Sequence, residues 1–350
     1  MASLRSLDAA ERRVLLPPVL PDSVEIPVGG AHRLTGAIFA TGWQVDVVRD
    51  GGGDAARDGV WLAALRARIE VVLESIDAQM SPWREASALM RFNRAGEGER
   101  VLVPEPMRAV IDGAIGIANL TGGAFDPTLH DAVALWGFGA TAVPGGLPEA
   151  DALAAMEGRR LDWRALTWDD DALIARDGLT LDLCGIAKGY AVDAVMDVIR
   201  ATPGAAAALV EIGGELKGWN LRPDGMPWWV EIERPESAVD APFMAALCDW
   251  SVATSGDYRR SFRHGDADYC HALDPRTLAP VQTGVASATV FDPLCWRADA
   301  LATALMVLGR DDALAFADAH AIPCILTVRE GNGLTDHLSA AMRAWLDDDD

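Results

Sequence analysis

The hydrophobic residues of this chain follow a helical period in some segments and a strand period in others, in no regular order. This mixture constrains the fold more than any other feature of the sequence. Between residues 60 and 80, apolar side chains recur every three or four positions with Arg and Glu between them, which predicts a helix with one buried face. Residues 106–120 have the same helical spacing. Residues 38–48 alternate as a strand does, and the glycines at 51–53 close it.

Later segments repeat this mixture. Residues 179–183 predict a short strand that enters a helix after Gly185, and residues 298–307 predict another helix. Residues 208–218 and 228–233 predict two strands joined by a loop rich in Gly, Asn and Pro. Because strands and helices interleave without a regular βαβ period, we expect an α+β fold with mixed sheets and flanking helices rather than a doubly wound sheet.

The domain organisation is expected to be simple. Residues 1–36 mix charges with prolines and glycines, which favours an N-terminal arm on the surface over a core element. Residues 37–345 are expected to form one domain, and residues 346–350 a solvated acidic tail. A chain of 350 residues that is 50% hydrophobic is long enough to bury a large core.

Charge and cysteine usage exclude several classes of function. The net charge of −22 argues against nucleic acid as a partner, and an anionic substrate would need a locally positive site or a metal. The five cysteines show no Cys-x-x-Cys pair, which fits a reducing compartment. The first residues lack an apolar segment followed by a cleavage site, so we expect a cytoplasmic location. No run of about 18 apolar residues predicts a membrane span.

Four segments combine Gly, an acid and a hydroxyl or His in places where packing alone does not demand them. In the first, residues 122–128, two glycines let the backbone approach a ligand closely. Phe125 beside Asp126 offers an apolar surface with a hydrogen-bond acceptor. A helix-terminating glycine turn stiffened by Pro127 explains the same residues equally well.

The second segment, residues 182–193, predicts a strand that ends in Gly185 at the start of a helix. Free backbone groups there can meet a ligand, and Lys188 can contact a phosphate or a ring carbonyl. The spacing is not that of a P-loop, in which two glycines flank four residues and are followed by Lys-Ser or Lys-Thr. Alternatively, Lys188 is only an exposed residue of the helix, and Asp193 is only a solvated acid on it.

The third segment, residues 251–260, precedes His271, which leads into an Asp-Pro turn. An imidazole at the rim of a cleft can take a proton from a hydroxyl nucleophile near neutral pH. A lone His is more often structural than catalytic, but none of the other His residues has comparable polar company.

The fourth segment contains Asp299 and Thr303, which lie four apart on the predicted helix and so project from the same face. The pair offers only oxygen ligands, as a hard cation prefers, and Mg²⁺ typically takes one or two protein carboxylates plus substrate phosphates and waters. The alternative is an Asp that stabilises the helix dipole and a Thr that bonds back to the preceding turn.

Together these segments resemble the ApbE family of FAD:protein FMN transferases, in order from about Phe39 to Gly309. The similar motifs are S-P-W at 81–83, S-A-L-M-R-F-N at 87–93, G-A-F-D-P-T at 123–128, L-W-G-F-G at 135–139, residues 181–193, V-E-I-G-G-E at 210–215, A-T-S-G-D-Y at 253–258, H-A-L-D-P-R-T at 271–277 and A-D-A-L-A-T at 298–303. The chain departs from the family pattern at residues 40–43, where A-T-G-W stands in place of M-G-T and a small or aromatic residue.

The resemblance implies a fold with an active-site cleft between two lobes. It also implies that FAD is cleaved, that FMN is joined to a Ser or Thr hydroxyl of an acceptor protein, and that AMP is released. His271 would be the base, and Mg²⁺ would be held against the FAD pyrophosphate by Asp299, Thr303 and the backbone carbonyl of Gly185. The residues implied to line the flavin and adenine sites are Ala40, Trp83, Ala124, Phe125, Asp126, Asp182, Lys188 and Leu273.

Two other functions use the same residues. A magnesium-dependent FAD pyrophosphatase would employ water as the nucleophile and release FMN and AMP. A non-catalytic FAD-binding protein would hold the dinucleotide without turnover. No residue in the sequence separates these functions from transfer.

Overall fold

The computed structural model of the chain describes residues 13–18, 26–51, 53–140, 147–158, 160–235, 241–265, 267–331 and 333–346. The acidic tail beyond Leu346 and the first residues, on which the expected cytoplasmic location rests, lie outside these ranges. Within the described residues, no helix combines the length and the apolar character that crossing a membrane requires.

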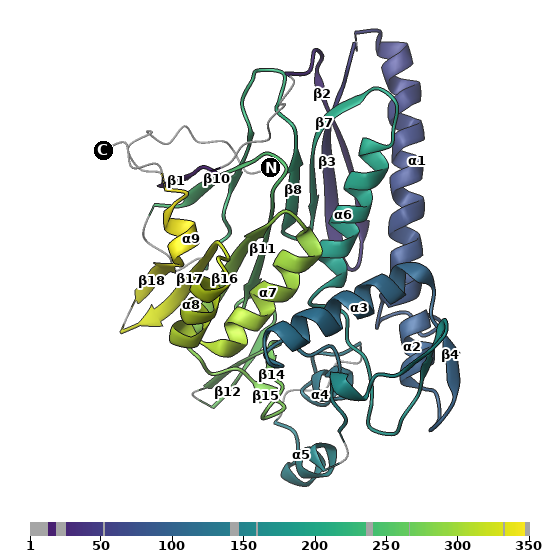
Figure 1. Ribbon diagram of the computed structural model, residues 1–350, viewed down its shortest axis with the longest axis vertical. Helices are drawn as coiled ribbons and strands as arrows, with labels where there is room; N and C mark the ends of the chain where they lie inside the picture. Colours follow the sequence, from purple (N-terminus) through teal and green to yellow (C-terminus); the bar gives the residue numbers. More distant parts are fainter. Residues whose placement is uncertain are drawn as a thin grey trace.

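A large antiparallel sheet organises the described part of the chain (Figure 1). Each strand in it pairs antiparallel with its neighbours. Its strands in spatial order are β18 (Gly333–Leu338), β17 (Cys324–Glu330), β16 (Val285–Asp292), β11 (Ser251–Gly256), β8 (Glu215–Trp219), β7 (Ala205–Ile212), β3 (Thr41–Arg49) and β2 (Ala31–Ile38).

Helices cover one face of this sheet and enclose the main core. They are α1 (Ala55–Met80), α2 (Ala88–Asn93), α3 (Glu105–Leu120), α6 (Ala187–Arg200), α7 (Cys295–Leu308) and α8 (Arg310–Ala319). In α1 the side chains of Leu65, Ile69, Leu73 and Ile76 are buried, as the helical period predicts. Asp54 caps the start of α1 by accepting the backbone N–H groups of residues 56 and 57.

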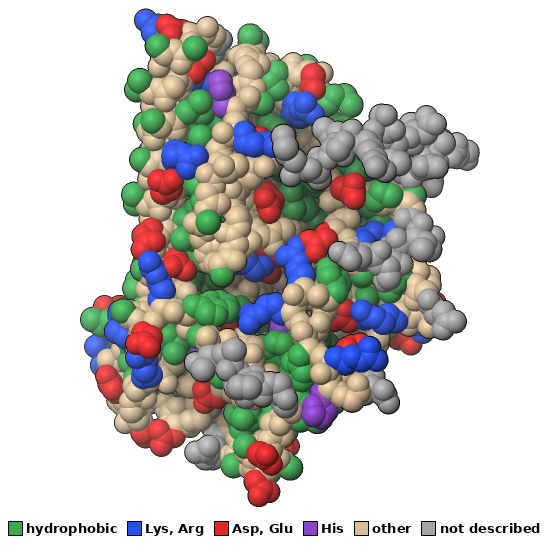
Figure 2. Space-filling view, turned by 180° about the vertical axis from the view of Figure 1, so that it is seen from behind, with side chains coloured by type: hydrophobic (Ala, Val, Ile, Leu, Met, Phe, Trp, Pro, Cys, Tyr) green, Lys and Arg blue, Asp and Glu red, His purple; other side chains and the backbone are tan. Residues whose placement is uncertain are grey.

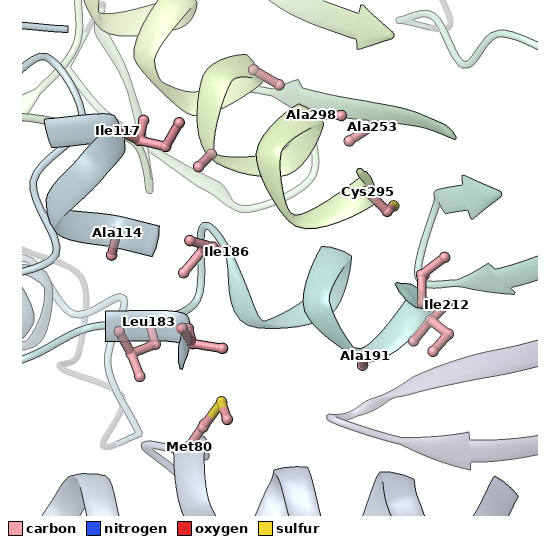
Figure 3. Close-up of a cluster of buried hydrophobic side chains, with 14 of the residues drawn as sticks. Met80, Ala114, Ile117, Leu183, Ile186, Ala191, Ile212, Ala253, Cys295 and Ala298 are labelled. Carbon is pink, nitrogen blue, oxygen red and sulfur yellow. The ribbon is translucent and has the colours of Figure 1, made fainter. Parts of the chain in front are cut away.

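Helices α6 and α7 pack closely because small residues lie where they meet. A Cβ atom on Gly189 would lie 2.4 Å from the backbone oxygen of Cys295, so only glycine fits there. Ala298 on α7 lies beside Ala253 on β11 (Figure 3). This close approach brings the first turn of α6 next to the start of α7.

The opposite face of the large sheet carries a second core and a smaller sheet of β1 (Arg13–Leu15), β10 (Phe243–Leu247) and β9 (Trp228–Glu231). Leu15 is fully buried in this core. Met342 of the short helix α9 (Ala340–Arg343) belongs to the same core. The surface arm expected over residues 1–36 therefore includes part of a sheet, and the expected boundary at residue 37 falls inside β2. The strand β1 pairs in parallel with β10, which is distant in sequence. The local composition of residues 1–36 could therefore not reveal that Leu15 belongs to a sheet.

A smaller lobe faces one end of the large sheet. It contains α4 (His130–Leu135), α5 (Ala150–Glu157), the hairpin of β12 (Ser261–His264) and β13 (Ala267–Cys270), and the pair β14 (Leu273–Asp274) and β15 (Ala279–Pro280). Its core includes Trp136, Phe138 and Leu273. A three-stranded sheet of β4 (Arg100–Leu102), β6 (Ala172–Ile174) and β5 (Trp168–Asp169), with a 3-10 turn at Trp163–Ala165, lies near α3.

Three strand predictions differ from the structure. Residues 38–48 contain a hairpin turn at Phe39 and Ala40, whose φ angles are 52° and 57°, and residues 208–218 turn at Gly213. Residues 179–183 belong to no described sheet, because the side chain of Asn93 bonds to both the backbone N–H and the carbonyl of Leu181, each at 2.8 Å. One amide side chain thus satisfies the groups that a neighbouring strand would otherwise pair.

Candidate active site

A cavity of about 610 Å³ opens where the end of the large sheet faces the smaller lobe. The β2–β3 turn, the β7–β8 turn and the end of β11 form one wall, while Leu129, Phe138 and Leu273 of the smaller lobe form another. The structure brings every site residue predicted from the sequence to this one cavity: Ala40, Trp83, Ala124, Phe125, Asp126, Asp182, Gly185, Lys188, His271, Leu273, Asp299 and Thr303. Their individual roles remain predictions.

The three residues predicted to bind the metal lie together between α6 and α7. Asp299 is buried, and its Oδ2 accepts the backbone N–H of Gly189 at 3.0 Å in the first turn of α6. Burial raises the pKa of Asp299. The Oγ1 of Thr303 lies 3.1 Å from the Oγ of Ser255, and a Cβ atom on Gly185 would lie 3.2 Å from that same Oγ1. The Gly185 backbone therefore lies directly beside Thr303.

Next to this group, the buried carboxylate of Glu215 forms an ion pair with Lys188, whose side chain is partly exposed. Burial opposes the charge of Lys188, but the carboxylates of Glu215 and Asp299 outweigh burial and raise the lysine's pKa above its usual value. Burial raises the pKa of Glu215 to about 7 despite the nearby ammonium. The Oε2 atom of Glu215 is buried without a hydrogen-bond partner. Two carboxylates thus face one ammonium, and one carboxylate oxygen is left free.

These donors fit a hard divalent cation that completes its shell with substrate oxygens. The side chains of Asp299, Thr303 and Ser255 offer only oxygen atoms, and Glu215, which has an unpaired carboxylate oxygen, lines the same cavity. Among the described residues there is no group of three or more His, Cys, Asp or Glu side chains that could hold a metal by themselves. The donor set therefore resembles the open sites that Mg²⁺ shares with phosphate-bearing substrates rather than an all-protein cage.

His271 also lines the cavity, in a geometry suited to a base. Its backbone N–H and its Nδ1 both approach the carbonyl oxygen of Arg260, at 3.0 and 3.3 Å. A carbonyl only accepts hydrogen bonds, so in the neutral ring Nδ1 carries the proton and Nε2 keeps a free lone pair. Burial, and then the charge of Arg260, lower the pKa of His271 to about 4. The imidazole is therefore neutral at pH 7 and able to accept a proton.

Aromatic and apolar side chains give the cavity a hydrophobic wall. Phe125 and Leu273 are buried, while Trp83 is 44% exposed at the mouth. The guanidinium carbon of Arg260 lies 5.6 Å from the centre of the Trp83 ring. Such a wall suits a planar heteroaromatic ligand.

Asp126 makes different contacts from those that the sequence suggested. Its Oδ1 accepts the backbone N–H and the hydroxyl of Thr128, at 2.9 and 2.6 Å, and its Oδ2 is paired with Arg160. Arg160 also donates to the carbonyl of Pro275 at 3.2 Å, beyond the His271 turn. Asp126 therefore fastens the 122–128 segment to the loop after His271, and its carboxylate is occupied by the protein's own groups.

Nearby, the Oδ1 of Asp182 accepts the backbone N–H of Cys184 at 2.8 Å, and the Asp182 N–H donates to the carbonyl of Pro127 at 2.7 Å. Asp182 therefore joins the first two segments through its backbone while it shapes the turn that leads to Gly185.

Sequence reasoning missed several residues that line or support the cavity: Arg160, Glu215, Ser255, Arg259 and Arg260. For Glu215 a signal was present. Glu215 and Lys217 are charged residues two apart on a strand, and both point into the core, where Lys217 pairs with Asp193. Residues two apart on a strand share one face, and charged residues on a buried face must be paired or functional because an unpaired buried charge is costly.

Comparisons with known proteins find relatives over most of the chain. The model of the ApbE family matches residues 39–326. An FAD:protein FMN transferase from Vibrio cholerae serotype O1 is 36% identical over 292 residues, covering 81% of this chain and 84% of that protein. The apo crystal structure of the flavinyl transferase ApbE from Pseudomonas stutzeri has a TM-score of 0.81 at 36% identity, covering 91% of this chain and 97% of that one. An apbe protein from Thermotoga maritima has a TM-score of 0.79 at 26% identity, covering 91% and 99%.

Proposed function

This chain belongs to the ApbE family and is a flavin transferase, and we propose that it joins the FMN part of FAD to a Ser or Thr hydroxyl of an acceptor protein and releases AMP. The observation that carries this proposal is the cavity itself. A neutral imidazole with a free Nε2, the buried carboxylate of Asp299 and the partly buried hydroxyl of Thr303 line the same space beside an apolar wall.

The proposed reaction requires two kinds of assistance. Bound Mg²⁺ would neutralise charge on the FAD pyrophosphate and so favour departure of AMP. Asp299 and Thr303, with the backbone carbonyl of Gly185, are the residues that would hold it. Burial strengthens the electrostatic effect of these oxygens because water screens them little.

The chain's own residues explain the rest of the step. His271 accepts the hydroxyl proton at Nε2 while the hydroxyl oxygen forms a new bond to the FMN phosphorus, and the bond from that phosphorus to the AMP oxygen breaks. The Arg260 carbonyl holds the ring in the tautomer that this transfer needs. Phe125 and Leu273 orient the flavin and exclude water from the reacting atoms. AMP leaves with the bonding electrons, so atoms and charges balance.

One assay separates transfer from the alternatives. The purified protein is incubated with FAD, Mg²⁺ and a candidate acceptor, and both AMP release and the acceptor's mass are recorded. Transfer predicts that the acceptor gains the mass of FMN through a phosphoester faster than free FMN accumulates. Free FMN released at one rate with and without every acceptor would support the pyrophosphatase instead. Tight FAD binding without AMP would support a flavin-carrying protein.

A further inference from the structure

We infer that Arg260 is a phosphate-binding residue of the cavity, which recognises the phosphate of the FMN group as it is transferred. The inference rests on the proposed function and adds a residue to it. Three cationic Lys or Arg side chains line the cavity among the described residues: Lys188, Arg259 and Arg260. The first is paired with Glu215 and the second with Glu233. For Arg260 the described residues provide no carboxylate within ion-pair distance.

The contacts of Arg260 hold its charge in place without neutralising it. Its Nη2 donates to the carbonyl of Phe138 at 2.6 Å, and its guanidinium lies 5.6 Å from the Trp83 ring centre. These partners are a neutral dipole and the electron-rich face of a ring, both of which favour a cation. The remaining N–H groups of the fork are available to a ligand.

The same residue also fixes the base. The backbone carbonyl of Arg260 accepts hydrogen bonds from the N–H and the Nδ1 of His271, both residues line the cavity, and the charge of Arg260 helps to lower the pKa of His271. A group that reacts at the Nε2 side of His271 therefore lies within the field of Arg260. In the proposed reaction that group is the phosphoryl under attack.

Charge argues that this ligand is an anion. On the face seen in Figure 2, Lys and Arg side chains are interspersed with Asp and Glu, and the whole chain has a net charge of −22. An anionic substrate is repelled by such a protein unless a local cation attracts it. A guanidinium suits phosphate because its planar fork can donate two parallel hydrogen bonds.

The test compares two ligands that differ only in the phosphate. Dissociation constants of FMN and of riboflavin are measured by flavin fluorescence without any divalent cation, for the wild type and for Arg260→Gln and Arg260→Lys. Loss of a charged hydrogen bond predicts that Arg260→Gln binds FMN roughly 10- to 100-fold more weakly while riboflavin affinity is unchanged. Arg260→Lys should fall between the two. Arg263→Gln, an exposed residue on β12 outside the cavity lining, is the matched control and should behave as the wild type.

Several outcomes would overturn the assignment. An unchanged preference for FMN in Arg260→Gln shows that the phosphate binds elsewhere. An equal loss of affinity for both flavins shows that Arg260 supports only the ring site. A normal FMN preference with a raised KM for the acceptor protein alone shows that Arg260 contacts the acceptor instead. If the wild type transfers no FMN at all but its FMN preference still depends on Arg260, the phosphate site stands and the proposed function fails.

Discussion

Replacing Arg160 by Met should destabilise the fold by roughly 3 kcal/mol at pH 7. The side chain of Asp126 is 0% exposed and that of Arg160 is 16% exposed, so the substitution leaves a buried carboxylate without its counter-charge. Removing one partner of a buried pair typically costs about 3 to 5 kcal/mol. We expect the lower end, because Thr128 still donates two hydrogen bonds to Asp126.

The assay is the free energy of unfolding from urea titrations at several pH values. Burial raises the pKa of Asp126 even with Arg160 present, so losing the guanidinium should raise it further. A carboxylate whose pKa is raised by folding destabilises the folded state while it is ionised, and protonation removes this cost. The difference in unfolding free energy between Arg160→Met and the wild type should therefore narrow as the pH falls toward 4.

Two variants sharpen the measurement. Arg222→Met breaks an exposed pair with Asp224 and should cost less than about 1 kcal/mol. Adding Asp126→Asn to Arg160→Met removes the stranded charge and should recover part of the loss. A cost for Arg160→Met no larger than that of the Arg222 control, at every pH, would refute the reasoning.

Three further changes test the site. His271→Ala should retain FAD affinity but slow transfer by ~10²–10⁴-fold. In the wild type the pKa of His271 is lowered to about 4, so the transfer rate should stay level from pH 8 to 6 and fall only near pH 4, where Nε2 is protonated. A rate that already halves near pH 6.5 would contradict this. Asp299→Asn should abolish AMP release, measured by chromatography, while circular dichroism shows an intact fold; undiminished release would remove Asp299 from the metal site. Gly189→Ala should cost about 1 to 3 kcal/mol in urea because its Cβ would meet the Cys295 backbone, whereas Gly116→Ala, with open space around it, should not destabilise α3. Equal effects of the two alanines would contradict the packing argument.

The sequence predicted the helices well because their signals are local. The buried face of α1 and the shared face of Asp299 and Thr303 follow from the period of the helix alone. The gathering of the predicted site residues could be expected only through the family resemblance. In the structure it follows from topology, since the β2–β3 turn, the β7–β8 turn and the end of β11 lie at the same end of one sheet.

What the sequence could not predict are contacts between distant residues. Asn93 replaces a strand partner for Leu181, and Arg160 joins Asp126 to Pro275 across separate segments. Neither leaves a periodic signal, because each depends on one side chain meeting one backbone group or carboxylate. The turn at Phe39 and Ala40 was missed for a related reason: both residues adopt positive φ angles, for which a sequence usually offers Gly or Asn.

The distribution of charge around the cavity explains how so acidic a chain can process an anionic dinucleotide. The carboxylates of Asp299 and Glu215 are buried between α6 and α7, where a helix N–H and an ammonium hold them and a divalent cation can offset what remains. His271, the proposed base in the same cavity, is kept neutral by burial and by the charge of Arg260, so its Nε2 lone pair is not lost to a proton near pH 7. Positive charge is left to the mouth, at Arg260. The proposed transfer to a hydroxyl would use each of these charges: the carboxylates to hold a cation, the neutral imidazole to take a proton, and the guanidinium to bind phosphate.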